Sequence, residues 1–290
     1  MPNYMLSWQQ AAALAAALGL AGLVLVRAGA PGGPLARRCA AHAGPFAREA
    51  GVVIGLYALW QLAGNLAGTP RDAIGHAWWI WHAERTAGLP SELDVQRLLL
   101  PHPLLSQAAN LYYATMHFGM LIAMLTWLFA LHRERYPAIR NAMAAVTATC
   151  LLISFIPVAP PRMLTPAGIV DLPARYGQSV YAALGPATGP VGADQLSAMP
   201  SVHVAWSVLV AWAVITSGAS RWRWLILAHP ALTVLVVVGT GNHYWADGLV
   251  AAAIVAVVLL AQAMLPALAA RAAAALRASR RPPEPAPEET

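Results

Sequence analysis

Long apolar runs separated by short polar segments dominate the pattern of the chain. A helix needs about 20 apolar residues to cross about 30 Å of hydrocarbon. Seven runs approach or reach that length, at 6–26, 50–68, 108–131, 138–158, 201–217, 222–239 and 244–268. We therefore predict an all-α, polytopic integral membrane protein with about seven transmembrane helices.

We expect the chain to divide into three units. Residues 1–49 hold one transmembrane helix and a cytoplasmic loop, 50–270 form a six-helix core, and 271–290 form a disordered, proline-rich cytoplasmic tail. The first run has no Lys or Arg before Arg27, so it lacks the charged start of a signal peptide and is interpreted as a true span. We find no internal repeat.

The composition agrees with a membrane protein and excludes other classes. Hydrophobic residues make up 59% of the chain and charged residues only 10%, whereas a soluble domain carries about 25% charged residues. The net charge of +6 comes from arginines scattered between apolar runs, which argues against a nucleic-acid partner. Cys39 and Cys150 are too few to build a disulfide framework.

The distribution of arginines predicts the orientation in the membrane. If the seven runs alternate, thirteen of the 18 arginines lie on one side and five on the other. Because arginine and lysine are enriched in cytoplasmic loops, we place the N-terminus outside and the C-terminus in the cytoplasm. The richness in Ala, Gly and Arg, with no lysine, favours a bacterial plasma membrane.

Two long connections then fall on the outer side, at 69–107 and 159–200. In the first, Ile74, Trp78 and Trp81 share one helical face, which is typical of a helix lying in the headgroup layer. A plain aromatic anchor at the membrane surface is the alternative interpretation.

Three polar segments at the outer ends of the apolar runs are candidates for chemistry, because ionisable groups there are costly. They are Pro160-Pro161-Arg162, Met199-Pro200-Ser201-Val202-His203 and Gly239-Thr240-Gly241-Asn242-His243-Tyr244-Trp245-Ala246-Asp247. Ser201 would lie at the first turn of a helix, whose free N–H groups favour anions. His243 and Asp247 are four residues apart and share a helical face.

This set of side chains suits phosphoryl transfer. Arg162 and the helix-end N–H groups would hold phosphate oxygens, and His243 would attack phosphorus. Asp247 would fix the tautomer of His243 and stabilise its positive form. His203 would protonate the leaving oxygen and then activate water or an alcohol.

The three segments resemble the motifs of the type 2 phosphatidic acid phosphatase superfamily, which uses a histidine nucleophile. Met199-Pro200-Ser201-Val202-His203 and Gly241-Asn242-His243-Tyr244-Trp245-Ala246-Asp247 are most similar to the branch related to fungal inositol phosphorylceramide synthase. Tyr112-Tyr113 followed by His117, Glu84-Arg85 and Asp171 also look like this branch.

The resemblance, which covers roughly 50–268, implies a lipid phosphotransferase without metal or organic cofactor. It implies catalytic roles for His243, His203 and Asp247, phosphate binding by Arg162, Ser201 and Asn242, and pocket positions for Tyr113 and His117. The donor would be a phospholipid or polyprenyl phosphate, and the acceptor a lipid alcohol or water.

The chain also departs from the broader superfamily. Val236 and Val237 occupy the positions of a Ser-Arg pair, Val202 replaces a glycine, and no lysine precedes Arg162. The phosphate pocket therefore has fewer cations than usual, which favours the transferase branch over an enzyme acting on bare phosphomonoesters.

Each of these residues also has a structural alternative. His243 with Asp247 could be a capping pair, Ser201 a helix cap, and Arg162 a headgroup anchor. His117 could be a hydrogen-bonded core histidine. The outer His76, His82 and His102 lack the repeated spacing of a metal site.

Three alternative functions remain open at this point. Hydrolysis of a lipid phosphate uses the same first step as transfer. A lipid transporter would have internal repeats and polar sites at mid-membrane, neither of which the sequence has. A purely structural membrane protein would leave the outer His, Ser and Arg residues unexplained.

Overall fold

The computed structural model describes residues 6–28, 33–64, 70–176 and 196–279. Within these ranges the regular structure is helical, apart from one isolated β-bridge between Val158 and Ser197. The elements are α1 (Trp8–Ala28), α2 (Pro34–Gly64), α3 (Pro70–Thr86), α4 (Glu92–Leu99), α5 (Pro103–Leu131), α6 (Tyr136–Ser154), η1 (Pro161–Met163), η2 (Thr165–Ala167), α7 (Leu172–Arg175), α8 (Val202–Ser217), η5 (Arg221–Leu227), α9 (Ala228–Gly239) and α10 (Trp245–Ser279).

Five of the described helical segments are long and apolar enough to cross a membrane. They are Trp8–Val26, Pro103–Leu131, Tyr136–Ser154, Arg221–Gly239 and Trp245–Leu265. The predicted polytopic, all-α fold is therefore confirmed. The predicted run at 50–68 falls in the second half of α2, and its last four residues lie outside the described ranges.

Helix α8 is apolar but has only 16 residues. At 1.5 Å per residue it is about 24 Å long, which is shorter than the hydrocarbon layer of about 30 Å. If its inner end reaches the cytoplasmic surface of the bilayer, its outer end lies below the opposite surface. Any site at the start of α8 is then recessed into the membrane.

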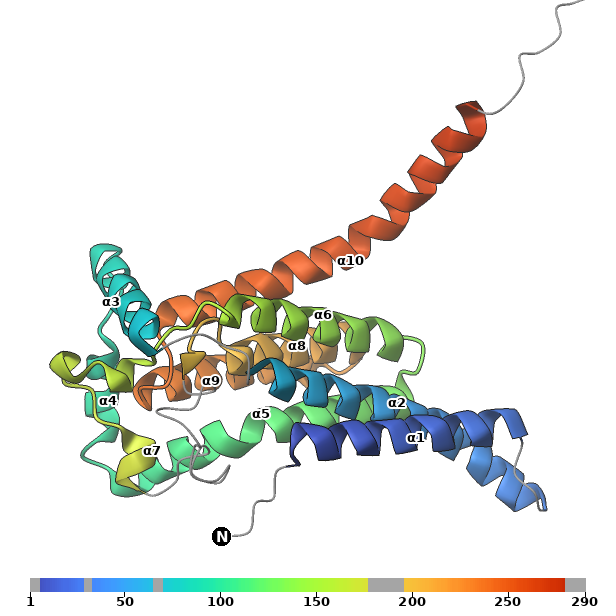
Figure 1. The fold of residues 1–290 in the computed structure, drawn as a ribbon, viewed down its shortest axis with the longest axis horizontal. Coiled ribbons are helices and arrows are strands. Elements are labelled where there is room, and N and C mark those ends of the chain that lie inside the picture. Colours follow the sequence, from blue (N-terminus) through green and yellow to red (C-terminus); the bar gives the residue numbers. More distant parts are fainter. Residues whose placement is uncertain (1–5, 29–32, 65–69, 177–195, 280–290) are drawn as a thin grey trace, which may run out of the picture.

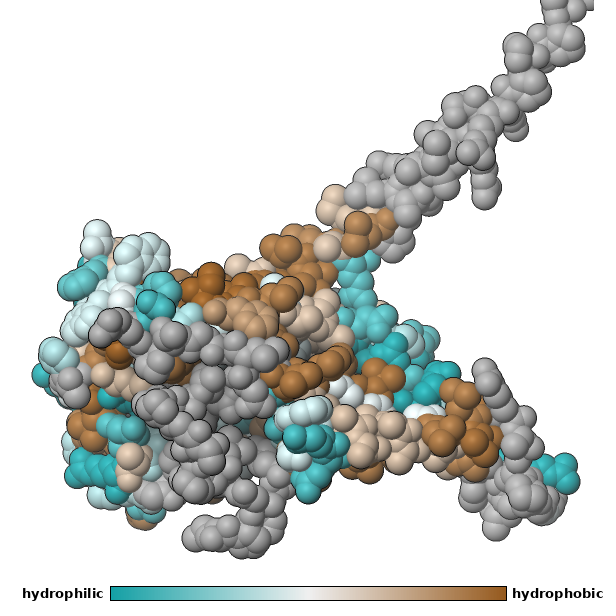
Figure 2. All heavy atoms as spheres, in the orientation of Figure 1, coloured by the Kyte–Doolittle hydropathy of each residue, from teal (hydrophilic) through white to brown (hydrophobic). Residues whose placement is uncertain are grey.

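The long helices form a bundle, and α3, α4 and α7 gather at one end of it (Figure 1). Apolar surface covers the middle of the bundle, and more hydrophilic surface lies at the end where the short helices gather (Figure 2). Exposed apolar side chains on the long helices include Leu111, Ile122, Leu152, Leu249 and Val257. In a membrane these side chains face lipid, so their exposure has no cost.

Helices α1 and α2 pack closely through glycines. A Cβ added at Gly22 would lie 2.6 Å from the backbone nitrogen of Arg48 and 2.7 Å from the carbonyl oxygen of Gly44. Small residues allow this backbone approach between membrane helices. Glu49 of α2 forms an ion pair with Arg140 of α6, which connects the hairpin to the rest of the bundle.

Two predicted irregular segments are helical in the structure. The expected loop before residue 50 belongs to α2 from Pro34 onward, with Pro45 inside the helix. The expected disordered tail is helical from 271 to Ser279, and 280–290 lie outside the described residues. Both segments are rich in alanine and arginine, which are strong helix formers, and this local preference exceeds the effect of their charge. The proposed division into three units stays a prediction.

Candidate active site

The three polar segments predicted from sequence meet at the end of the bundle covered by α3 and α4. Backbone hydrogen bonds join them: Arg162 N–H donates to the Gly241 carbonyl (3.0 Å), and Ser201 N–H donates to the Asp247 carbonyl (3.3 Å). Ala198 N–H also donates to the Val158 carbonyl at 3.1 Å. Segments far apart in the sequence are thus held together by the main chain.

The connection between α9 and α10 is a tight turn that presents His243 and Asp247. The N–H groups of Asn242 and His243 both donate to the Val237 carbonyl at 3.1 Å, which closes the end of α9. Gly241 has a φ of +72°, and a Cβ there would lie 2.9 Å from Ile169 Cγ2 and 3.3 Å from Arg162 Cβ. Glycine is required at this position by both conformation and space.

His243 is held by two acceptors on the same ring nitrogen. Its Nδ1 lies 2.7 Å from the Ala198 carbonyl oxygen and 3.2 Å from Asp247 Oδ2. Because both neighbours accept hydrogen bonds, Nδ1 carries the proton in the neutral ring and Nε2 keeps its lone pair. His243 is 5% exposed, so its Nε2 is held in one orientation within a nearly closed site.

Asp247 is fully buried and has two tasks at the start of α10. Its Oδ2 faces His243 Nδ1 and also accepts the N–H of Tyr244 at 2.9 Å. Tyr244 directly precedes α10, so this second bond satisfies one of the free N–H groups of the helix start. Both alternatives raised by the sequence, a capping residue and a partner of His243, are therefore present in one side chain.

Arg162 and Asn242 lie side by side. The Arg162 Nη1 donates to Asn242 Oδ1, and the Arg162 Nε lies 3.4 Å from Asp171 Oδ2. Asn242 in turn donates from Nδ2 to Thr240 Oγ1 at 2.7 Å. These contacts fix the guanidinium, and Arg162 is 8% exposed. A guanidinium fixed in this way can bind an anionic group without a large entropic cost.

Ser201 caps α8. Its hydroxyl oxygen accepts the N–H of Val204 at 3.4 Å, and the residue is fully buried. This is the structural alternative considered for Ser201, and its binding of phosphate stays a prediction.

The rings of Tyr113, His117, His203 and His243 form one cluster. The ring of His203 stacks on Tyr113 with centroids 4.3 Å apart, contacts His117 edge-on at 4.2 Å, and lies 5.6 Å from the ring of His243. Helix α5 supplies Tyr113 and His117, and α8 supplies His203. The structure thus brings together all the catalytic and pocket residues that the sequence predicted.

A family profile described as the PAP2 superfamily matches residues 78–261. The chain belongs to the PAP2 superfamily. The matched segment runs from α3 into α10 and contains every residue of the site described above. Searches of curated proteins and of solved structures find no significant match. Membership of the PAP2 superfamily assigns the chain to phosphatase or phosphotransferase chemistry on lipid phosphates.

This PAP2 superfamily member has two valines where the resemblance led us to look for a Ser-Arg pair. Val236 and Val237, at the positions noted above, are buried in the apolar core of the bundle. Those positions therefore provide no positive charge for a phosphate.

Gln96 is a site-supporting residue that sequence reasoning missed. From α4, its Oε1 accepts the N–H of Val170 (2.7 Å), and its Nε2 donates to the carbonyls of Val170 (2.9 Å) and Gly239 (3.3 Å). It thereby joins the segment after Arg162 to the turn before His243. The flanking Asp94 and Arg97 make the segment look like a solvent-exposed helix, so no local signal marks the burial of Gln96.

In the described part of the chain, no three His, Cys, Asp or Glu side chains are grouped so that they could hold a metal ion. The expectation of a reaction without metal or cofactor stays a prediction.

Proposed function

We propose that this protein transfers a phospho-headgroup from a membrane lipid to a lipid alcohol through a phosphohistidine-type intermediate on His243. The observation that carries the proposal is the double restraint on His243 Nδ1 by Ala198 and Asp247. This restraint leaves Nε2 as the nucleophilic atom.

In the first step, His243 Nε2 attacks phosphorus, and the bond from phosphorus to the leaving lipid oxygen breaks. His203, as imidazolium, gives its proton to that oxygen, so that a neutral lipid alcohol departs. The negative Asp247 stabilises the positive charge that develops on His243. Arg162 and Asn242 would hold the oxygens of the phosphoryl group.

In the second step, His203 acts as a base and removes the proton of the acceptor hydroxyl. The acceptor oxygen attacks phosphorus, and the bond from phosphorus to Nε2 breaks, which restores His243. If water takes the place of the alcohol, the same step gives hydrolysis. The alternative function is therefore a lipid phosphate phosphatase acting on a polyprenyl or glycerolipid phosphate.

The small number of positively charged side chains at the site favours a phosphodiester donor over a phosphomonoester. A phosphodiester carries one negative charge, whereas a phosphomonoester carries nearly two at neutral pH. Arg162 already shares its charge with Asp171, and Val236 and Val237, in the apolar core, add none.

The proposal is tested with the purified protein in mild detergent. A panel of phosphodiester lipids and lipid phosphates is offered with and without a lipid alcohol, with His243→Gln as the control. We expect a new phospholipid to form from a phosphodiester donor only when the alcohol is present. Release of inorganic phosphate from a lipid phosphate, independent of alcohol, would instead support the phosphatase.

The site would face the outside of a bacterial plasma membrane, on the basis of the arginine distribution. The test uses the Cys39→Ser background, in which the remaining Cys150 is buried. Ala87 and Glu134 are exposed and lie on opposite sides in the proposed orientation. An impermeant thiol reagent should label Ala87→Cys in intact cells and Glu134→Cys only after lysis. The reverse pattern would move the site to the cytoplasm.

A further inference from the structure

A buried carboxyl group from α3 contacts the start of α10, one residue from Asp247. Glu84 is 2% exposed, and its Oε1 accepts the backbone N–H of Ala246 at 2.6 Å. Ala246 lies in the first turn of α10, where backbone N–H groups have no partner within the helix. Asp247 satisfies the N–H of Tyr244, so two carboxyl groups from different helices share the helix start.

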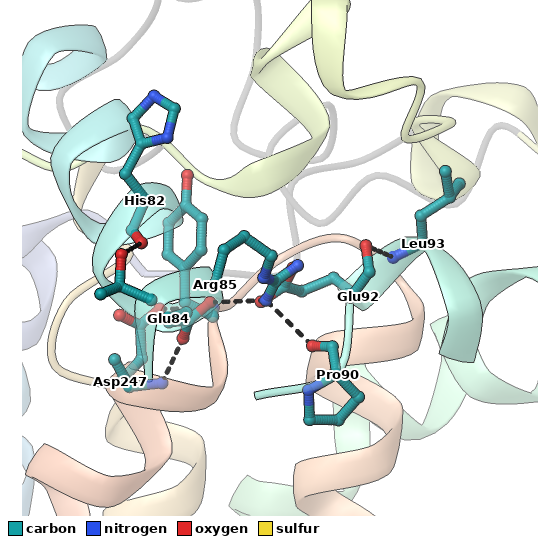
Figure 3. Close-up of polar contacts among 11 residues, drawn as sticks. His82, Glu84, Arg85, Pro90, Glu92, Leu93 and Asp247 are labelled. Carbon is teal, nitrogen blue, oxygen red and sulfur yellow. Dashed lines mark hydrogen bonds and ion pairs between the residues drawn. The ribbon is translucent and has the colours of Figure 1, made fainter. Parts of the chain in front are cut away.

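Glu84 belongs to a compact group with one positive and two acidic side chains (Figure 3). Arg85 Nη2 lies 3.3 Å from Glu84 Oε2, and Arg85 Nη1 lies 3.2 Å from Glu92 Oε2. Arg85 also donates to the Pro90 carbonyl at 2.9 Å. Glu92 from α4 is fully buried. If both glutamates were ionised, the group would bury an uncompensated negative charge beside Asp247, which is costly.

Protonation of Glu84 removes that charge. The pKa of Glu84 is raised from 4.5 to about 9, first by burial and then by a hydrogen bond with Glu92 and the negative charges of Glu92 and Asp247, which together outweigh the lowering by the Ala246 N–H. The groups that face Glu84 are Arg85 of α3, Glu92 of α4, and Ala246 and Asp247 of α10. At neutral pH Glu84 is then uncharged, and the group no longer sets two buried negative side chains against one guanidinium.

We propose that Glu84 is a positioning residue that works as a neutral carboxylic acid. Its Oε1 holds the first turn of α10, and its Oε2 would carry the proton toward Glu92 while it still accepts from Arg85 Nη2. The start of α10 is thereby fixed without a second negative charge next to Asp247, so His243 interacts with one carboxylate only. This inference rests on the proposed role of His243 and Asp247.

The same helix also braces the Arg162 segment. The Ala73 carbonyl of α3 accepts the N–H of Ala159 at 3.1 Å, and His76 Nδ1 lies 2.8 Å from the Pro157 carbonyl oxygen. The face predicted to contact the membrane, with Ile74, Trp78 and Trp81, is instead partly buried against the apolar cluster that includes Tyr244, whereas Trp79 is 73% exposed. Helix α3 thus contacts two of the three segments that build the site through its backbone, its polar side chains and this apolar face.

The test compares Glu84→Gln with Glu84→Ala. Glutamine can accept from Ala246 and donate to Glu92 as the protonated acid does, so we expect it to keep kcat within about twofold. Alanine leaves the first turn of α10 unsupported, and we expect kcat to fall by about 10- to 100-fold with little change in KM. The wild-type kcat should also fall as pH rises through about 9, whereas that of Glu84→Gln should not fall there.

A second readout needs no activity. Glu84 would be protonated in the folded protein and ionised in the unfolded chain between its ordinary pKa of 4.5 and about 9. The wild type should therefore lose thermal stability relative to Glu84→Gln as pH rises through this window, and the two should run parallel below it.

The two readouts separate the possible failures. If the thermal stabilities of the wild type and of Glu84→Gln change in parallel across the whole pH range, the proposal that Glu84 is a neutral acid is overturned. A folded Glu84→Ala variant with wild-type kcat, or a Glu84→Gln variant as impaired as Glu84→Ala, would overturn the positioning role. If the wild type converts no lipid phosphate, the proposed function fails, but the stability comparison still decides the protonation of Glu84.

Discussion

The His243→Gln variant is expected to lose turnover of the lipid donor by about 10⁴-fold or more, as is common when a covalent nucleophile is removed. Glutamine can still donate a hydrogen bond to the Ala198 carbonyl, so the turn between α9 and α10 should keep its conformation. It has no ring nitrogen to form a bond to phosphorus. Initial rates of donor consumption in detergent measure the loss.

His102→Gln is the matched control, because His102 is exposed at the start of α5 and makes no side-chain capping bond. It should retain wild-type rates. Turnover in His243→Gln that equals that of His102→Gln would exclude His243 as the nucleophile, and another residue of the ring cluster would have to take that role.

The second large effect is expected at His203. Replacement by glutamine removes the acid of the first step and the base of the second, so steady-state turnover should fall by about 10²- to 10⁴-fold. With a radiolabelled donor whose leaving oxygen is weakly basic, the first step no longer needs the acid. The label should then accumulate on the protein, because the second step still lacks its base.

The double variant His203→Gln with His243→Gln controls for other labelled sites and should carry no acid-labile, alkali-stable label. Equal labelling of the single and double variants would mean that the label lies elsewhere than on His243. Normal turnover in His203→Gln would remove His203 from the mechanism.

Much of the site was predictable because its chemistry lies in short, local motifs. His243 lies two residues before α10 and Asp247 lies in its first turn, and their contact was expected from the spacing of four residues. The apolar runs likewise located the helices to within a few residues, as for 138–158 against Tyr136–Ser154.

What the sequence did not reveal depends on tertiary contacts. Glu84 was singled out only by resemblance and Gln96 not at all, and both become buried only because α3 and α4 fold back over the end of the bundle. The cap by Ser201 is local, but sequence spacing alone could not separate it from a phosphate contact. The segments before residue 50 and after residue 270 were predicted to be irregular. Both are helical because their alanines and arginines favour helix.

The short length of α8 has a consequence for kinetics. If α8 begins below the lipid surface, the rings of His203 and His243 are recessed, and in the proposed reaction donor and acceptor reach them by lateral diffusion while their chains remain in the bilayer. The quantity that sets saturation is then the mole fraction of each lipid in the membrane. Adding inert lipid or detergent at constant bulk substrate dilutes the substrate in two dimensions and slows the enzyme.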